Sequence, residues 1–228
     1  MLYVVPTPLG NLEDITQRAL RVLREAKAVF CEDTRRTRIL MSHFGIRTPL
    51  LRYKDYNPRD LERILERLKA GEELALVSDS GTPVISDPGW RLVSLARKEG
   101  VPVTCLPGPC AAAAAVAGSG LPGDSFVFLG FLPRSDSKRR RLLKSAAALG
   151  RTLVVYESPA RVLDLLQIAQ ETLTPAPQVA VARELSKVYE EWMLGSPEEV
   201  RARLDAKGPP RGEFVVLIHP GKKTAHDG

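Results

Sequence analysis

Several residue types and patterns are scarce or missing from this 228-residue sequence, and each shortage excludes a class of protein. The three cysteines, Cys31, Cys105 and Cys110, lie far apart and lack metal-site spacing. An odd number of cysteines without an export signal indicates reduced thiols rather than a disulfide scaffold. We expect Cys31 and Cys105 to be small buried residues beside strands. The sequence therefore does not resemble a small secreted protein.

Long apolar runs are also missing. No segment approaches the ~18 consecutive apolar residues of a membrane-spanning helix. The first residues, 1–6, lack the basic start and the small-residue cleavage site of a signal peptide. We therefore expect a cytoplasmic protein that has no membrane partner.

Familiar catalytic signatures are missing as well. The histidines are His43, His219 and His226, and none has a partner at ligand spacing, so we expect neither a metal site nor a histidine-based triad. The sequence contains no G-x-x-x-x-G-K-[ST] phosphate loop and no G-x-G-x-x-G after a strand. It also contains no G-x-S-x-G nucleophile elbow. These absences argue against a P-loop nucleotidase, a common dinucleotide-binding enzyme and a serine hydrolase.

The overall composition is that of a folded protein with a sizeable core. Hydrophobic residues make up 44% of the chain and charged residues 26%. The formal net charge is +6 and the sequence pI is about 9.4. This modest positive excess permits an anionic partner such as nucleic acid but does not require one.

Short apolar runs alternate with amphipathic segments along the chain, which predicts an α/β fold. In the first half we expect strands at 2–5, 28–31, 74–77 and 101–106, and helices at 16–27, 35–44, 59–70, 90–97 and 110–117. In the second half we expect strands at 126–129, 152–156, 178–182, 188–194 and 214–218, and helices at 138–149, 160–173 and 197–205.

A Gly- and Pro-containing linker, 119–125, separates two α/β domains, 1–118 and 126–219, and a loose tail follows at 220–228. Segment 188–194 follows 178–182 too closely for a crossover helix, so we expect the two to form a hairpin. Ser196 and Pro197 have the residue types of an N-cap and a first helical position.

Four loops that follow predicted strands contain the residues suited to chemistry. They cover residues 6–11, 32–37, 78–89 and 106–110. If the strands are parallel and adjacent, these loops gather at one edge of the sheet, where open α/β sheets bind ligands. The 78–89 loop is the most informative, because its hydroxyls, carboxylates and glycines are too many for a plain connection. Taken alone, the first and last loops are better interpreted as ordinary turns.

In this order the motifs resemble the tetrapyrrole methylase superfamily of S-adenosylmethionine-dependent methyltransferases. Within it they are most similar to the ribosomal small subunit methyltransferase I family. The segments that carry the resemblance are 6–16, 31–35, 78–89, 107–109, 130–133, 156–159 and 182–185. It implies two α/β domains with the cofactor in a cleft between them, a homodimer, and methylation of the ribose 2′-hydroxyl of a cytidine in the decoding centre of 16S rRNA within the small ribosomal subunit.

The same resemblance implies which residues contact the methyl donor, S-adenosylmethionine. Carried onto this sequence, the expected contacts are Pro8, Gly81, Thr82, Pro83, Ile85, Cys110, Ala111, Tyr156 and Ala182. No metal ion is expected.

A ribose hydroxyl is a weak nucleophile, so a base or a stabilising charge should assist methyl transfer. The candidates are Glu32, Asp33, Asp79, Glu184 and Lys187, and we rank Asp33 and Asp79 first because they lie on the strand-end loops. A carboxylate could accept the proton, and a lysine could stabilise the developing alkoxide. These side chains could equally orient the loops or the RNA.

Two basic groups could contact RNA phosphates. One consists of Arg35, Arg36 and Arg38; the other is the run Lys138, Arg139, Arg140 and Arg141, together with Lys144. Charge runs on helices are often only solvated faces, and that alternative stays open here.

Two other functions compete with the rRNA methyltransferase. A methyltransferase for a tetrapyrrole or another small molecule could use the same fold, because fold alone does not decide the substrate. A non-enzymatic RNA-binding protein is the second alternative, although it would not need the Gly-Thr-Pro loop. The identity of the acceptor of a labelled methyl group separates all three.

Overall fold

The computed structural model describes residues 1–221, which form two compact units. The first unit is Met1–Cys110, and the second begins at Ala111. This division differs from the expected boundary near residue 118, because helix α5 (Ala111–Gly118) packs on the second sheet. Of the predicted tail, residues 222–228 lie outside the described part of the chain.

The first unit contains a five-stranded sheet in which all strands are parallel. In chain order its strands are β1 (Leu2–Val4), β2 (Ala28–Cys31), β3 (Leu50–Arg52), β4 (Leu74–Leu76) and β5 (Val103–Cys105), and their order in the sheet is β3-β2-β4-β1-β5.

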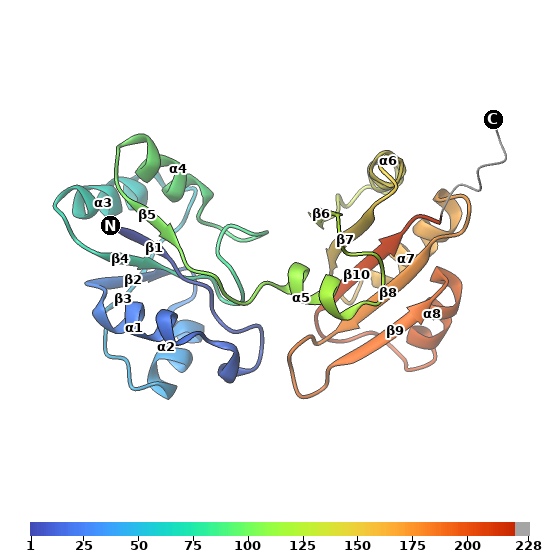
Figure 1. Cartoon of the computed structure of the whole chain (residues 1–228), viewed down its shortest axis with the longest axis horizontal. Helices are drawn as coiled ribbons and strands as arrows, with labels where there is room; N and C mark the ends of the chain where they lie inside the picture. Colours follow the sequence, from blue (N-terminus) through green and yellow to red (C-terminus); the bar gives the residue numbers. More distant parts are fainter. Residues whose placement is uncertain (222–228) are drawn as a thin grey trace. The chain divides into compact units, whose positions relative to one another are not determined.

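Helices cover both faces of this sheet (Figure 1). Helices α1 (Gln17–Glu25) and α2 (Thr34–His43) pack on one face, and α3 (Pro58–Lys69) and α4 (Trp90–Lys98) on the other. A short 3-10 helix, η1 (Leu12–Asp14), precedes α1. Burial on both faces explains why β2 and β4 are wholly apolar and show no alternation.

The second unit contains a mixed five-stranded sheet of order β6-β7-β10-β8-β9. Its strands are β6 (Phe126–Phe131), β7 (Thr152–Glu157), β8 (Gln178–Arg183), β9 (Glu191–Gly195) and β10 (Phe214–His219). Strands β6 and β7 are parallel and the other pairs antiparallel, and β8 and β9 form the predicted hairpin.

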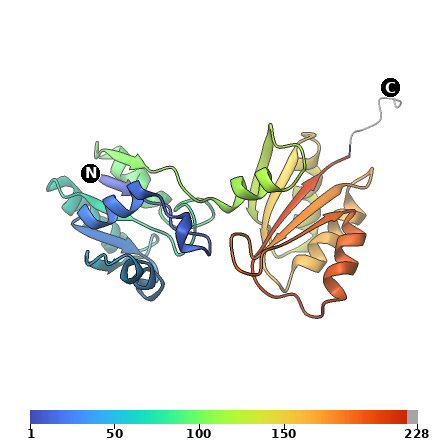
Figure 2. The same cartoon turned by 60° about the horizontal axis from the view of Figure 1, so that its bottom comes forward.

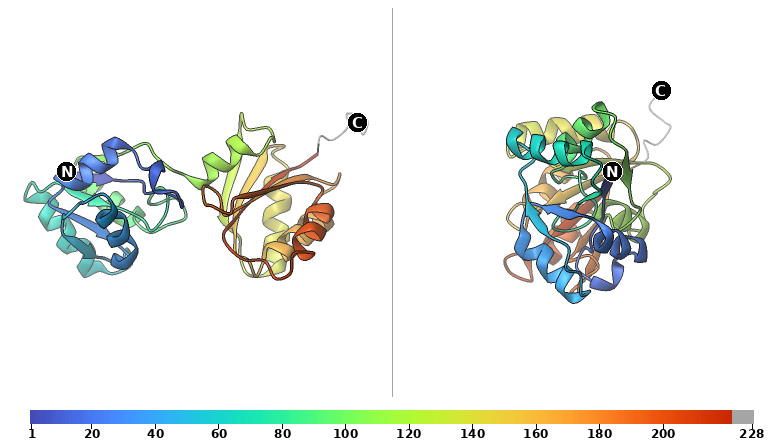
Figure 3. Two further views of the ribbon diagram at one scale, coloured as in Figure 1. Left: turned by 90° about the horizontal axis from the view of Figure 1, so that it is seen from below. Right: turned by 90° about the vertical axis from the view of Figure 1, so that its left-hand side faces the viewer.

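Three helices of the second unit, α6 (Asp136–Ala147), α7 (Val162–Thr172) and α8 (Pro197–Asp205), bury one face of its sheet (Figures 2 and 3). Helix α5 contacts β7 and β10 from the opposite face. At its end, a Cβ on Gly118 would lie 2.8 Å from the Trp192 ring, so only a residue without a side chain allows this approach. The small residues of α5 thus let it lie close to the sheet.

Most predicted elements are confirmed, including the α8 cap. Ser196 and Glu199 form a complete capping box, and Pro197 occupies the first turn. Strand β3 was not predicted, because three residues are too few to show a pattern. The expectation that Cys105 is buried is wrong, because β5 is an edge strand and this side chain faces outward. Across residues 1–221 no helix is both long and apolar enough to cross a membrane.

Candidate active site

The strand-end loops of the first unit meet at the carboxyl edge of its parallel sheet, as expected. Thr7 and Gly81 exchange two backbone hydrogen bonds, with N···O distances of 2.9 and 3.0 Å. The Thr82 hydroxyl donates to the Pro109 carbonyl at 2.8 Å. The loops after β1, β4 and β5 are therefore joined into one surface. It contains the predicted donor contacts Pro8, Gly81, Thr82, Pro83 and Ile85, and the unit ends at Cys110.

The loop after β4 has a strained backbone. Val84 and Ser86 have φ angles of 78° and 59°, a region that a β-branched residue such as valine rarely enters. The Val84 N–H donates to the Pro88 carbonyl at 3.2 Å, which closes the loop. A Cβ on Gly89 would lie 2.9 Å from Leu76 Cδ2, so glycine is required where α4 begins. Strain of this kind persists where the surroundings impose it, and it concentrates at functional sites.

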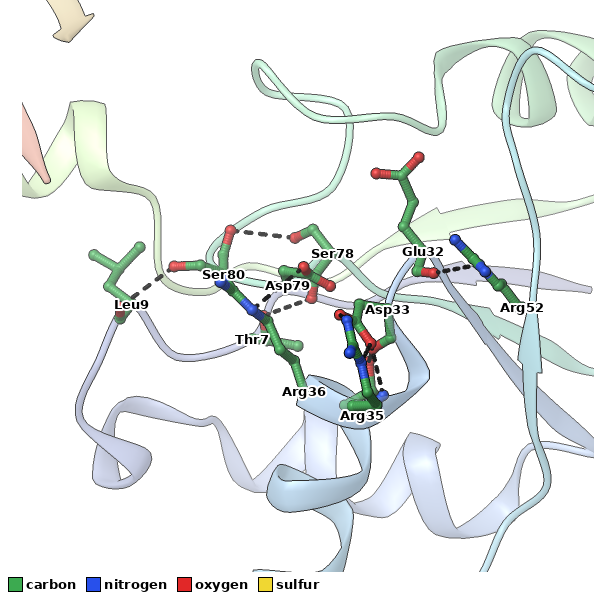
Figure 4. A network of polar contacts seen from close by, with 11 residues as sticks. Thr7, Leu9, Glu32, Asp33, Arg35, Arg36, Arg52, Ser78, Asp79 and Ser80 are labelled. Atoms are coloured by element: carbon green, nitrogen blue, oxygen red, sulfur yellow. Dashed lines mark hydrogen bonds and ion pairs between the residues drawn. The ribbon is translucent and has the colours of Figure 1, made fainter. Parts of the chain in front are cut away.

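Asp33 has a defined local role at the start of α2. Its Oδ1 accepts the Arg35 backbone N–H at 2.9 Å, and its carboxylate also accepts Arg35 Nε and Nη2 at 3.0 and 2.7 Å (Figure 4). These hydrogen bonds from Arg35 hold the pKa of Asp33 well below its usual range. Asp33 is thus an N-cap whose oxygens are already engaged, and it is a weak proton acceptor.

This role predicts a pH-dependent effect of Asp33→Asn on stability. Asparagine also caps helices but cannot replace the ionic contacts to Arg35. Because the pKa of Asp33 is lowered in the folded state, its stabilisation is present above the ordinary aspartate pKa of about 3.9 and is lost as the pH falls below it. Urea unfolding should therefore show the wild type to be the more stable protein at neutral pH, with the difference shrinking in acid. A difference that is the same at both pH values would contradict this role.

Asp79 and Glu32 are less engaged than Asp33. Asp79 Oδ2 lies 3.8 Å from Arg36 Nε, which links the loops after β2 and β4 (Figure 4). The Glu32 carboxylate points away from Asp33 and accepts no hydrogen bond from residues 1–221, although its backbone carbonyl accepts Arg52 Nε at 3.1 Å. Partial burial and the negative charges of Asp79 and Asp55 raise the pKa of Glu32.

Two depressions adjoin at this edge, and Asp79 lines both. One is polar, has a volume of about 640 Å³, and is lined by Glu32, Asp33, Thr34, Arg35, Arg52, Tyr53, Lys54, Tyr56 and Asp79. The other is smaller and more apolar, with a volume of about 230 Å³, and is lined mainly by residues 7–12 and by α2. A carboxylate at their shared border can contact groups bound in either depression.

The predicted donor contacts of the second unit gather on the face of its sheet that α5 covers. Tyr156 and Ala182 both pair with Val215, one from each neighbouring strand. The Tyr156 hydroxyl accepts the Ala112 N–H at 3.0 Å. This hydrogen bond places the start of α5, including Ala111, beside Tyr156. Ala182 itself has no exposed surface. The structure thus brings Ala111 and Tyr156 together and leaves Ala182 in the interior.

Glu184 and Lys187 form a cluster in the loop between β8 and β9. Lys187 Nζ lies 3.0 Å from both Glu184 Oε1 and Glu213 Oε2. Burial opposes the charge of Lys187, but the hydrogen bonds to Glu213 and Glu184 outweigh it and raise its pKa. A Cβ on Gly212 would lie 2.6 Å from Glu184 Oε1, so Gly212 makes room for this carboxylate. The two candidates therefore hold the loop in shape.

Two motifs singled out in the sequence are joined by Arg161. Its Nη2 donates to the Leu132 and Pro133 carbonyls at 2.9 and 3.1 Å. The same atom lies 3.2 Å from Glu157 Oε2, whose side chain has no exposed surface. The segments 130–133 and 156–159 thus form one structural unit, and sequence reasoning did not identify Arg161 as its centre.

The basic run on α6 is not one exposed face. Arg139 is buried, with 4% of its surface exposed, because it shares the inward face of the helix with Leu143 and Ala146. Its guanidinium pairs with Asp136 and is not exposed, so the prediction that Arg139 contacts RNA phosphates does not fit this position. Arg140 pairs with Glu171 at 2.6 Å, while Lys138 and Arg141 are exposed. In the first unit Arg35 is exposed but engaged with Asp33, and Arg36 faces Asp79.

Sequence reasoning missed Arg52, Lys54 and Tyr56, which line the larger depression. Arg52 is the last residue of the short strand β3, and Lys54 and Tyr56 follow it. The only sequence signal for this strand was the apolar pair Leu50 and Leu51 after Pro49. Across residues 1–221 no group of three or more His, Cys, Asp or Glu side chains is arranged to hold a metal ion.

Comparison with known proteins places this geometry in a family. Residues 1–200 match the family model for tetrapyrrole (corrin/porphyrin) methylases. The chain is 44% identical to a ribosomal RNA small subunit methyltransferase I of a Hydrogenobaculum species, over 95% of this chain and 94% of that protein. It is 45% identical to the protein of that name from Thermotoga maritima, over 95% of this chain and 97% of that one.

Solved structures agree on the fold. A diphthine synthase superimposes with a TM-score of 0.73 at 16% identity and covers 96% of this chain and 88% of its own. The uroporphyrin-III C-methyltransferase of Thermus thermophilus, complexed with S-adenosyl homocysteine, gives 0.63 at 20% identity and covers 95% and 96%. The chain therefore belongs to the tetrapyrrole methylase family and, within it, to the ribosomal RNA small subunit methyltransferase I family.

Proposed function

We propose that this protein transfers a methyl group from S-adenosylmethionine to the ribose 2′-hydroxyl of a cytidine in the decoding centre of 16S rRNA. The observation that supports this most strongly is the 44–45% identity, over nearly the whole chain, to methyltransferases named for the small-subunit ribosomal RNA. The family model covers residues 1–200, so it matches the strand-end loops of the first unit and most of the second unit as well.

The residues present suit the proposed methyl donor. At Gly81 a Cβ would lie 3.1 Å from Leu9 Cδ2 and 3.6 Å from the Pro109 carbonyl, so glycine lets the loops after β1, β4 and β5 approach without a side chain between them. Ile85 offers exposed apolar surface for an adenine ring, and the start of α5 offers small side chains. We propose that Pro8, Gly81, Thr82, Pro83, Ile85, Cys110, Ala111 and Tyr156 hold the donor, and that Ala182 supports them from the interior.

When bound, S-adenosylmethionine supplies an electrophilic methyl group on a sulfonium. The protein must align the ribose hydroxyl and take its proton. We assign proton acceptance to Asp79, because it lines both depressions and has one long ion pair. Asp33 caps α2, and Glu184 and Lys187 hold the β8–β9 loop in shape. We therefore assign these three residues a structural role and not a role in proton transfer.

The proposed substrate context is the assembled small subunit in the cytoplasm, approached by a homodimer. The exposed cations Arg35, Lys138 and Arg141 are the proposed phosphate contacts, together with Arg36 and Arg140 where RNA displaces their present partners. Sedimentation of the purified protein measures the dimer directly.

The test is a transfer assay with labelled S-adenosylmethionine and three acceptors: small subunits from cells lacking this enzyme, protein-free 16S rRNA, and uroporphyrinogen III. We expect label in the RNA of the subunits. Label in the porphyrinogen alone would instead support the small-molecule methyltransferase. An absence of label in every acceptor, with RNA binding retained, would support the non-enzymatic alternative.

A further inference from the structure

The larger depression of the first unit is not explained by donor binding. It lies at the carboxyl ends of β2, β3 and β4, and its volume of about 640 Å³ is in the range of small-ligand sites. Its lining is mostly polar and carries both signs of charge. A ligand that fits it should therefore have hydrogen-bonding edges as well as a flat or apolar part.

An exposed aromatic residue stands at the edge of this depression. Tyr56 is 67% exposed, and Lys54 Nζ lies 5.7 Å from the centre of its ring. The loop that carries it is fixed at both ends, because the Asn57 N–H donates to the Lys54 carbonyl and the Lys54 N–H donates to Asp60 Oδ2, each at 2.9 Å. A rigidly held, exposed ring beside a cation is a typical stacking platform for an unpaired nucleobase.

Two side chains at the carboxyl ends of neighbouring strands offer a matched acceptor and donor. The Glu32 carboxylate accepts no hydrogen bond from the described residues, and the guanidinium of Arg52 is fixed by its Nε bond to the Glu32 carbonyl. Glu32 directly follows β2 and Arg52 ends β3, and these two strands pair with Cys31 opposite Arg52. The pairing edge of cytosine presents an amino donor at N4 and acceptors at N3 and O2, and carboxylates are the usual acceptors for N4.

We propose that this depression binds the target nucleotide, extruded from its RNA, with Tyr56 stacked on the base and Glu32 and Arg52 reading its pairing edge. The inference rests on the proposed function and names the residues that would select cytidine. Enzymes that modify one nucleotide commonly take it out of its stack into a pocket of this kind.

This assignment predicts discrimination between cytosine and uracil. Uracil has a carbonyl oxygen at position 4, where cytosine has an amino group, so a carboxylate at Glu32 attracts cytosine and repels uracil. A glutamine in its place could donate to the uracil oxygen. Glu32→Gln should therefore change which base is accepted, whereas a merely structural role for Glu32 would lower activity on both bases equally.

The test uses small subunits reconstituted with either cytidine or uridine at the target position, and measures kcat/KM for each. We expect the wild type to favour cytidine and Glu32→Gln to reduce that preference by about tenfold or more. Tyr56→Ala should raise KM for the subunit about tenfold, and Tyr56→Phe should restore it, because stacking needs the ring. Tyr189→Ala is the matched control, because Tyr189 is also a largely exposed tyrosine but belongs to the second unit, and it should leave KM unchanged.

Calorimetry of S-adenosylmethionine binding shows whether each variant is folded and competent. If Glu32→Gln binds the donor but keeps the wild-type preference for cytidine, the pocket assignment is overturned. The same holds if Tyr56→Ala binds the donor but leaves KM for the subunit unchanged. A wild type that methylates neither substrate would instead overturn the proposed function, so the two failures are distinguishable.

Discussion

Replacing Asp79 with asparagine should lower kcat for methyl transfer to the small subunit by about 10²- to 10⁴-fold, the usual contribution of a general base. Asparagine keeps the shape of the side chain but cannot take the proton of the ribose hydroxyl. The Asp79 backbone is held beside Ser78, whose hydroxyl donates to the Gly81 carbonyl at 3.0 Å, so the loop should keep its conformation. Single-turnover kinetics with saturating donor and subunit measure this step.

Asp33→Asn is the matched control, because it makes the same chemical change on the neighbouring loop. Asparagine at this position still caps α2, so we expect turnover within a few-fold of the wild type. Donor binding by calorimetry should be unchanged in both variants. Full turnover by Asp79→Asn, or an equal loss in the two variants, would remove Asp79 from the role of base.

The second large effect is on stability. Arg161→Met should lower the free energy of unfolding of the second unit by about 3 kcal/mol, because it leaves the Glu157 carboxylate buried without a counter-charge. It also removes the two hydrogen bonds to the Leu132 and Pro133 carbonyls. Urea unfolding followed by tryptophan fluorescence in a Trp90→Phe background reports on this unit, because the remaining tryptophan, Trp192, lies in β9.

Arg140→Met provides the comparison. Arg140 also pairs with a glutamate, Glu171 at 2.6 Å, but both side chains are about 40% exposed. The expected loss is much smaller than for Arg161→Met, as for other solvated ion pairs. Adding Glu157→Gln to Arg161→Met should recover part of the loss by removing the isolated charge. Similar losses for Arg161→Met and Arg140→Met would show that burial of the pair does not matter.

Much of the first unit could be predicted from the sequence, for a physical reason. A parallel sheet buries its strands on both faces, so they appear as short apolar runs between amphipathic helices. The loops after such strands share one edge. The contact between Thr7 and Gly81, which are far apart in the sequence, follows from this topology once the two strands are known to be neighbours.

Other features depend on tertiary contacts that a linear pattern does not contain. Arg139 lies within a run of exposed cations, yet the helical repeat turns it toward the core. Helix α5 follows the first sheet in sequence but packs on the second, where Tyr156 and Trp192 meet its two ends. Strand β3 is too short to be recognised, and the depression formed by Arg52 and Tyr56 was missed with it.

The candidate site shows the same division. The sequence predicts which loops contain the site residues, but it does not predict which carboxylate has a structural role and which is left to contact the substrate. Asp33 and Asp79 are equivalent in the sequence as carboxylates on strand-end loops. Only the contacts separate them, because Arg35 engages both oxygens of Asp33, while Asp79 faces two depressions.

The most direct test of the central claim identifies the methylated atom. Small subunits from cells lacking this enzyme are incubated with it and S-adenosylmethionine, and the 16S rRNA is digested to nucleosides for mass spectrometry. We predict one new 2′-O-methylcytidine per subunit, at a decoding-centre position that becomes resistant to alkaline cleavage. A methyl group on a base, on another nucleotide or on no RNA at all would contradict the account.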